Sequence, residues 1–342
     1  MLDERFVWSI VIVADPEKCR RNPIIMNLKR NSAISLWTSR RYESEDDLIK
    51  MQNLLMEGRS QTNDWHYPHV GDLNFWFFMV TCHLNPLEFI RLWHNAQGKL
   101  VGYAMLGEDP SFDWQVLPEY EGHGIELEAF AWAEMRLIEL VKQDAERWGG
   151  KLISGVRQDD VLRIAFLIEH GFRRGEYAEV NMICPLNDEI PQPSVPFGCQ
   201  VRAFAGESEL ANRVEAHRQV WHPWTVGNVS DEDYATFMRI PGYEQQLDVV
   251  AVASDGVIAA YVNGWIDPLN QVGDLGPVGA LQAYRRQGLT KAVLLECMRR
   301  MERRGMKRVS VSTGETNETG LRLYGSVGFK IVNKYFEYVR EY

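Results

Sequence analysis

The chain has 342 residues, of which 37 are Lys or Arg and 47 are Asp or Glu, so its formal net charge is −10. Hydrophobic residues make up 45% and charged residues 25%, as in ordinary globular proteins, which excludes a disordered or low-complexity chain. The negative charge disfavours a nucleic-acid partner, because such affinity comes largely from cationic contacts to phosphate. The length favours about two domains.

The cysteines and the first residues bear on the cellular compartment. Five cysteines are widely spaced and include no C-x-x-C pair: Cys19, Cys82, Cys184, Cys199 and Cys297. We therefore expect no metal site and a reducing, cytoplasmic location. The apolar stretch 6–14 is too short to span a bilayer and follows Asp3 and Glu4, where an export signal would be positive, so no membrane partner is expected. Residues 1–25 are interpreted as an N-terminal extension whose native status is left open.

A proline-rich stretch divides the chain. Between Leu186 and Gly198, three prolines stand close together: Pro191, Pro193 and Pro196. Proline fixes φ and removes a backbone donor, so the stretch suits an extended connector. The sequence therefore predicts a domain over residues 26–186, a linker over 187–198 and a second domain over 199–342.

Hydrophobic periodicity predicts alternating strands and helices in the first domain. In chain order these are a strand (33–40), a helix (45–57), a hairpin (89–94 and 100–106), a strand (112–117), a long helix (126–146), a strand (152–156), a helix (160–169) and a strand (177–183).

The second domain is predicted to follow nearly the same order. Its elements are a strand (201–204), a helix (208–221), a hairpin (247–253 and 257–265), a strand (272–280), a long helix (288–304), a strand (309–313), a helix (318–325) and one or two strands within 329–340. Gly171-Phe172 and Gly328-Phe329 end the last helix in each half. The shared order indicates a diverged internal duplication.

A basic, glycine-containing turn precedes the long helix of the second domain. It reads Arg285-Arg286-Gln287-Gly288-Leu289-Thr290. Backbone amides at a helix N-terminus bind anions, glycine allows close approach, and arginine adds charged donors suited to phosphate. The turn therefore predicts a phosphate-binding site.

The turn is followed by Asn317, Tyr324 and Gly328-Phe329, in an order that resembles the GNAT superfamily of acyl-CoA-dependent N-acyltransferases. Thr290 is larger than the Gly or Ala usual there. The resemblance covers most of the second domain and implies an α/β fold with a mixed sheet. Each of two GNAT-like domains would hold a mostly antiparallel twisted sheet flanked by helices.

The resemblance also implies roles for residues in the second domain. The backbone of Val278, Gly279 and Ala280 would bind the pantetheine arm of acetyl-CoA, the acyl donor. The pyrophosphate would be held by the turn residues Arg285, Arg286, Gln287, Gly288, Leu289 and Thr290. Asn317 would bind the cofactor arm. Tyr324 would protonate the leaving thiolate, since a phenol keeps its proton at neutral pH.

The acceptor amine needs a base and a binding surface. Asp274 is the first candidate base, because it precedes the cofactor segment on the same strand and could face the cleft. The alternative is a structural carboxylate. Trp221, His222 and Trp224 are candidates for an aromatic acceptor wall, whereas His217 and His222 are individually better explained by structure than by catalysis.

The first domain carries the wrong chemistry at the matching positions. These are Glu121 opposite Arg285, Glu126 opposite Thr290, Asp160 opposite Asn317 and Leu167 opposite Tyr324. Carboxylates repel a pyrophosphate, and leucine has no proton to give. The first domain is therefore interpreted as a degenerate copy. Whether it binds another ligand is left open.

Together these features predict an acetyl-CoA-dependent N-acetyltransferase. The primary amine of a small molecule would attack the thioester directly, in the C-terminal domain. Two alternatives stay open: a protein or peptide N-acetyltransferase, and a non-catalytic acyl-CoA sensor. Homodimerisation is also left open.

Overall fold

The computed structural model describes residues 36–62, 66–80, 82, 84–107, 110–186 and 190–342. The predicted extension over 1–25 and the start of the first predicted strand lie outside these residues. Across the described ranges, no helix combines the length and apolarity needed to cross a membrane.

The N-terminal half alternates strands and helices much as predicted. Its elements are β1 (Trp37–Arg41), α2 (Glu45–Thr62), α3 (Val70–Phe75), the π-helical turn η2 (Trp76–Val80), α4 (Pro86–Phe89), β2 (Ile90–Asn95), β3 (Leu100–Leu106), β4 (Phe112–Val116), η3 (Pro118–Tyr120), α5 (Ile125–Gln143), α6 (Ala145–Trp148), β5 (Lys151–Arg157), α7 (Val161–Glu169) and β6 (Arg173–Pro185). The long helix predicted over 126–146 is divided at Asp144, whose side chain caps α6 by accepting from the amide of Arg147.

The C-terminal half repeats the order. Its elements are β7 (Gln200–Ala203), η4 (Gly206–Glu209), α8 (Leu210–Trp221), η5 (Thr225–Gly227), α9 (Asp231–Phe237), η6 (Gln245–Leu247), β8 (Asp248–Val252), β9 (Ile258–Asp267), β10 (Val272–Ala280), η7 (Gln282–Tyr284), α10 (Leu289–Arg303), β11 (Arg308–Gly314), α11 (Glu318–Ser326) and β12 (Lys330–Glu341). Helix α9 was not predicted from the sequence, nor were α3, η2 and α4, all of which are short.

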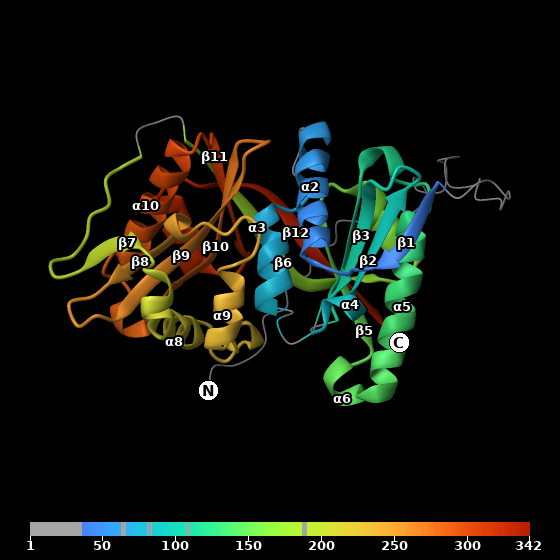
Figure 1. The fold of residues 1–342 in the computed structure, drawn as a ribbon, viewed down its shortest axis with the longest axis horizontal. Coiled ribbons are helices and arrows are strands. Elements are labelled where there is room, and N and C mark those ends of the chain that lie inside the picture. Colours follow the sequence, from blue (N-terminus) through green and yellow to red (C-terminus); the bar gives the residue numbers. More distant parts are fainter. Residues whose placement is uncertain (1–35, 63–65, 81, 83, 108–109, 187–189) are drawn as a thin grey trace. The chain divides into compact units, whose positions relative to one another are not determined.

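The strands form two sheets (Figure 1). One has four strands in the order β1-β2-β3-β4, and the other has eight in the order β5-β12-β6-β11-β10-β9-β8-β7. Neighbouring strands are antiparallel except for β10 and β11, which are parallel. The fold is therefore the mixed α/β architecture predicted from the sequence.

The closing strand of each half pairs with the other half. Strand β6 inserts between β11 and β12, and β12 pairs on its far side with β5. Val180 and Met182 of β6 pack in the core of the C-terminal half, whereas Tyr338 of β12 packs in that of the N-terminal half. The sequence predicts one sheet for each domain; instead, hydrogen bonds of the large sheet cross the predicted boundaries 26–186 and 199–342.

The two halves share local geometry at the turn before their long helices. Backbone φ is positive at Gly122 and Arg286, at 73° and 65°, and again at Gly124 and Gly288, at 116° and 83°. Seven residues past the N-caps Asp160 and Asn317 come the buried side chains of Leu167 and Tyr324. These matches support the duplication inferred from the sequence.

Helix α2 packs on β3 and β4 of the four-stranded sheet, and α3 packs on β9 and β10 of the eight-stranded sheet (Figure 1). Gly71 of α3 packs against Trp265 of β9 so closely that a Cβ at this position would lie 2.6 Å from the indole. The side chain of Gln52 donates to the carbonyl oxygen of Pro241, and that of Asn270 donates to the carbonyl oxygen of Met56. The N-terminal half is thereby fixed against the strands that carry the candidate site.

Candidate active site

Strands β10 and β11 are parallel neighbours for only three residues. They pair over Val272–Asp274 and Arg308–Ser310, after which β10 pairs with β9 alone and β11 with β6 alone. The facing edges of residues 275–280 and 311–314 have no strand partner in the described part of the chain. An extended chain with amide groups could therefore hydrogen-bond between them as an added strand.

The predicted pantetheine-binding residues lie along the open part of β10. Val278, Gly279 and Ala280 pair with β9 on the opposite edge. A Cβ at Gly279 would lie 2.7 Å from Cγ1 of Val220 and 2.9 Å from the hydroxyl of Tyr261. Packing of α8 and β9 therefore accounts for the glycine at this position.

The basic turn lies at the end of β10. Arg285, Arg286, Gln287 and Gly288 are exposed, whereas the side chain of Leu289 is buried, so only its backbone can meet a phosphate. The guanidinium of Arg285 donates through Nε to the carbonyl oxygen of Ala280, 3.2 Å away. Gly288 caps α10 without a side chain. The first amides of α10 thus face outward beside two exposed arginines.

The corresponding turn of the N-terminal half is closed by its own carboxylate. Oε1 of Glu126 accepts from the amide of Gly122 at 2.7 Å, and Oε1 of Glu121 accepts from the hydroxyl of Tyr67 at 3.2 Å. In the N-terminal half, the carboxylate of Glu126 thus accepts the hydrogen bond of a turn amide that a phosphate would otherwise need.

Tyr324 is 7% exposed and packs edge-to-face on Phe329. Among the described residues, its hydroxyl has no hydrogen-bond partner. Burial, and then the nearby carboxylate of Asp274, raise the pKa of this phenol, so it stays protonated at neutral pH.

Asn317 is occupied by a structural role. Its Oδ1 accepts from the amide of Gly320 at 3.1 Å and its Nδ2 donates to Oγ1 of Thr313 at 2.9 Å. These bonds cap α11 and leave one amide hydrogen for a ligand.

Asp274 is 6% exposed and lies at the point where β10 and β11 separate. The hydroxyl of Ser310 donates to its Oδ1 at 2.6 Å. Burial, and then the charge of Asp72, raise the pKa of Asp274 well above its usual range. A carboxyl with a raised pKa is a better proton acceptor when ionised.

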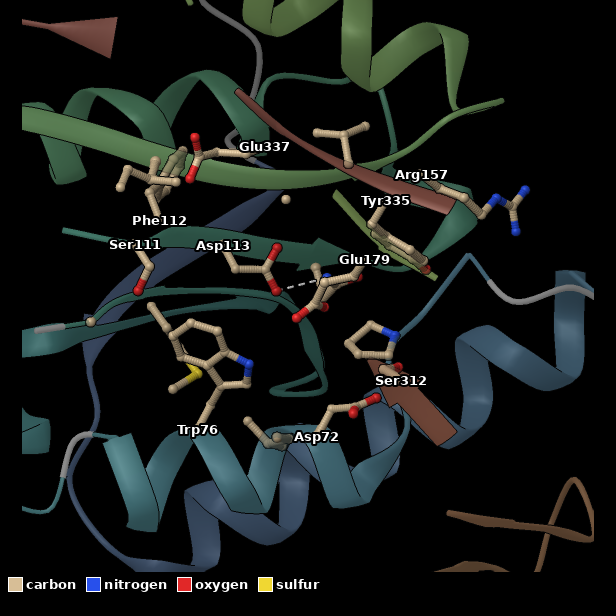
Figure 2. Close-up of a pocket in the computed structure, with 18 of the residues that line it drawn as sticks. Asp72, Trp76, Ser111, Phe112, Asp113, Arg157, Glu179, Ser312, Tyr335 and Glu337 are labelled. Atoms are coloured by element: carbon tan, nitrogen blue, oxygen red, sulfur yellow. Dashed lines mark hydrogen bonds between the residues drawn. The ribbon is translucent and has the colours of Figure 1, made fainter. Parts of the chain in front are cut away.

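A cavity of about 730 Å³ reaches Asp274 from the N-terminal half. Its lining includes Asp72 and Trp76 of the N-terminal half and Glu179 of β6, together with Asp274, Ser310 and Ser312 of the C-terminal half. Figure 2 shows Asp72, Glu179 and Ser312 around the same space. Since Val309 and Val311 pack in the core with α10, alternation along β11 directs Ser310 and Ser312 to the opposite, cavity face.

The residues predicted to form the acceptor wall do not line this cavity. Trp221 donates from its indole nitrogen to the hydroxyl of Tyr261, and Trp224 is 65% exposed. His222 follows α8 as its C-cap. His217 is buried, and burial followed by the charge of Arg213 lowers its pKa to about 3, so it is neutral. Asp72, Trp76 and Glu179 were not predicted from the sequence, because their proximity to Asp274 depends on packing between the halves.

Over the ranges that the structure describes, no group of three or more His, Cys, Asp or Glu side chains is arranged to hold a metal ion.

Residues 214–329 match the model of the Acetyltransferase (GNAT) family. This segment runs from α8 to the residue before β12 and contains the open strand edge, the basic turn and Tyr324. This segment is therefore a GNAT acetyltransferase domain, and the family catalyses acyl transfer. No match was found among curated proteins.

Solved structures extend the likeness to the whole fold. A GCN5-related N-acetyltransferase from Sphaerobacter thermophilus is 20% identical, with a TM-score of 0.60 over 91% of this chain and 97% of its own. A tandem GNAT protein from the clavulanic acid biosynthesis pathway is 16% identical, with a TM-score of 0.61 over 89% and 98%. A GNAT-family acetyltransferase from Colwellia psychrerythraea is 16% identical, with a TM-score of 0.53 over 89% and 100%. The chain has the fold of tandem GNAT proteins, with the family-matched copy at its C-terminal end.

Proposed function

We propose that the protein is an acetyl-CoA-dependent N-acetyltransferase that acetylates the primary amine of a small molecule in its C-terminal half. The observation that carries this proposal is the convergence of three features on one strand opening. The edges of β10 and β11 separate at Asp274 and Ser310, the basic turn follows β10, and Tyr324 is near enough for the charge of Asp274 to raise its pKa.

The donor would bind as an added strand. Backbone groups of Val278 and Ala280 would hydrogen-bond the pantetheine amides, and the free amide hydrogen of Asn317 would reach the same arm. The pyrophosphate would accept from the first amides of α10 and from Arg285 and Arg286.

A second cavity supports a place for the nucleotide end of the donor. It has a volume of about 330 Å³ and lies between Gly288 and Lys291 of the turn region and the linker residues Pro191 and Pro196. The linker is held there because Arg299 of α10 donates to the carbonyl oxygen of Ile190.

Asp274 and Tyr324 would divide the proton transfers. Asp274 would accept a proton from the acceptor ammonium, directly or through a water, and leave a neutral amine. The amine nitrogen would form a bond to the thioester carbonyl carbon, the carbon–sulfur bond would break, and Tyr324 would protonate the sulfur. The nitrogen would give up its remaining extra proton as the amide forms, and this proton would restore the Tyr324 phenol directly or through water. The products would be the N-acetylated amine and CoA with a free thiol.

The test is acetyl-CoA turnover over a panel of primary amines, followed through the free thiol and by mass spectrometry of the acceptor. An amine-dependent rise in thiol together with an acceptor about 42 mass units heavier, the gain when an acetyl group, C₂H₃O, replaces one hydrogen, supports the proposal. Tight CoA binding without turnover on any small amine or basic peptide would support the sensor alternative instead. Turnover on peptides alone would support the protein acetyltransferase.

A further inference from the structure

The cavity beside Asp274 extends into the N-terminal half, between β4 and β5. Among the described residues, these strands are linked by one isolated parallel bridge, between Ser111, just before β4, and Ile153 of β5. The cavity lining includes residues further along both strands, among them Phe112 and Gly155. By the internal repeat, this opening corresponds to the opening between β10 and β11. The first copy therefore has an equivalent opening, and its cavity continues to the candidate base of the second copy.

The opening of the first copy is unsuited to a second acyl-CoA. Its turn amide at Gly122 is satisfied by Glu126. Inside the opening, the guanidinium of Arg163 forms an ion pair with Asp113 and lies 3.8 Å above the ring of Trp114. The space is therefore available to a different ligand that reaches Asp274.

The charges of the cavity are unbalanced near Asp274. Asp72 of α3, Glu179 of β6 and Asp274 all line it, and none forms an ion pair with a described Lys, Arg or His. The charge of Arg59 acts on Asp72 and Asp274 from a greater distance and offsets only part of what raises their pKa values. Three arginines of the lining are each held by another acid: Arg59 by Asp267, Arg157 by Asp159 and Arg163 by Asp113.

These carboxyl groups lie in surroundings that penalise their charge. Burial raises the pKa of Asp72 to about 6 and also raises the pKa of Glu179. Grouped carboxylates of this kind are stabilised by a bound cation. Two further basic residues, Arg147 of α6 and Lys151, also line the cavity. Lys151 is the first residue of β5 and Arg157 the last, so these two residues lie at the opposite end of that strand from Arg157.

Aromatic side chains face the same cavity. Trp76 is 43% exposed, and Phe112, Trp148 and Tyr335 also line the space. In Figure 2, Trp76 and Phe112 lie on the left of the view, and Asp72, Glu179 and Ser312 lie to their right. Aromatic faces combined with carboxylates recognise organic cations with an apolar body.

We propose that this cavity is the acceptor site and that it selects amines carrying at least one further positive charge. The reacting amine would lie beside Asp274, and the second cationic group would lie between Asp72 and Glu179. The apolar body would lie along the aromatic residues of the opening between β4 and β5. This inference rests on the proposed function.

The experiment compares acceptors matched in length that differ only in remote charge. The pairs are 1,5-diaminopentane with 1-aminopentane, and lysinamide with norleucinamide. The wild type is expected to prefer the dication in kcat/KM by roughly tenfold or more, the effect of one partly buried charge pair. Glu179→Gln and Asp72→Asn should each raise KM for the dication several-fold more than KM for the monoamine. Asp72→Asn should in addition move the pH profile with both acceptors, because the charge of Asp72 raises the pKa of Asp274. Equal kcat/KM for both members of each pair in the wild type would overturn the inference.

The control variant is Glu176→Gln. Glu176 lies on the same strand as Glu179 but is exposed and outside the cavity lining. It should keep the wild-type preference. Loss of the preference in this variant would mean that overall charge steers the dication, which contradicts the site. Asparagine at position 72 retains an oxygen to accept from the amide of His69, so helix α3 keeps its cap.

Calorimetric titration of 1,5-diaminopentane separates this inference from the proposed function. Binding in the wild type that is weakened by Glu179→Gln supports the cation site even if no acceptor is acetylated, and in that case the proposed function alone fails. Acetylation of monoamines and dications at equal rates, with no measurable diamine binding, refutes the cation site and leaves the acetyltransferase standing.

Discussion

The imidazole of His69, in the N-terminal half, lies with Nε2 3.2 Å from the carbonyl oxygen of Val272, the first residue of β10. Its Nδ1 accepts from the amide of Gly71, so the network assigns the proton to Nε2, which donates to Val272. Burial lowers the pKa of His69 well below its usual value and keeps the ring neutral. The bond fixes α3, and with it Asp72, against Val272, which lies two residues before Asp274 on β10.

Reversal of charge in the basic turn should weaken donor binding. Arg285→Glu places in the C-terminal half the residue type that its N-terminal counterpart carries, and we expect the Kd for CoA to rise roughly tenfold or more, because a charged donor is replaced by a repelling group. Arg303→Glu, the same change at the other end of α10, is the control. Titration calorimetry measures both, and equal affinities for the two variants would contradict the pyrophosphate assignment.

Removal of the phenol should slow the release of thiolate. Tyr324→Phe keeps the packing on Phe329 but has no proton to give, so kcat should fall by about 10²-fold while CoA affinity stays near that of the wild type. Steady-state kinetics combined with CoA titration makes the comparison. An unchanged kcat would remove Tyr324 from the proton transfer.

The pH profile should report Asp274. A base acts in its ionised form, so kcat/KM should rise with pH through the pKa of Asp274, which burial has raised. Ser310→Ala removes a hydrogen bond that favours the ionised carboxylate, so the acid limb should move to higher pH. Asp274→Asn should lower kcat by on the order of 10²-fold and abolish the limb. An acid limb that stays in place in both variants would assign it to another group.

The exchange of closing strands should make the halves interdependent. Expressed alone, residues 187–342 lack β6, so β11 and β12 lose their common partner, and residues 1–186 lack β12. We expect neither fragment to show a cooperative thermal transition and their co-expression to restore one, because the large sheet is then complete. Circular dichroism melting tests this. Independent, cooperative folding of residues 187–342 would show that the sheet closes within one half.

A buried neutral histidine should make the protein sensitive to acid. His217 has a pKa near 3 when folded and near 6.5 when unfolded, so between these values the unfolded chain binds more protons. Its contribution to stability is complete above about pH 6.5 and is lost by about 1.4 kcal/mol per pH unit as the pH falls toward 3. The difference in unfolding free energy between the wild type and His217→Gln should change by this slope between pH 6 and pH 4. A constant difference would mean that His217 titrates normally.

The longer strands and helices were predictable because their apolar residues recur with the period of a strand or of a helix. The bounds of β10 agree with the predicted strand, and α10 lies within the helix predicted over 288–304. It buries one apolar face, which includes Leu289, Val293, Leu294, Cys297, Met298 and Met301. The duplicated turn was also readable, since glycine at positions 124 and 288 is required by positive φ.

The cavity was not predictable, because it depends on contacts between distant segments. Asp72 belongs to a six-residue helix without a strong pattern, and Glu179 belongs to a strand predicted to stay in its own half. The two reach Asp274 only through the His69 contact and the insertion of β6 beside β11. The sequence predicts an acceptor wall at Trp221, His222 and Trp224, which do not line this cavity.

The central claim is that the C-terminal half alone binds the acyl donor. A crystal structure of the protein with CoA tests it most directly. We expect one CoA per chain, with the pantetheine arm between β10 and β11, the pyrophosphate at residues 285–290 and the thiol beside Tyr324. CoA bound between β4 and β5, at the turn that holds Glu121 and Glu126, would contradict the account.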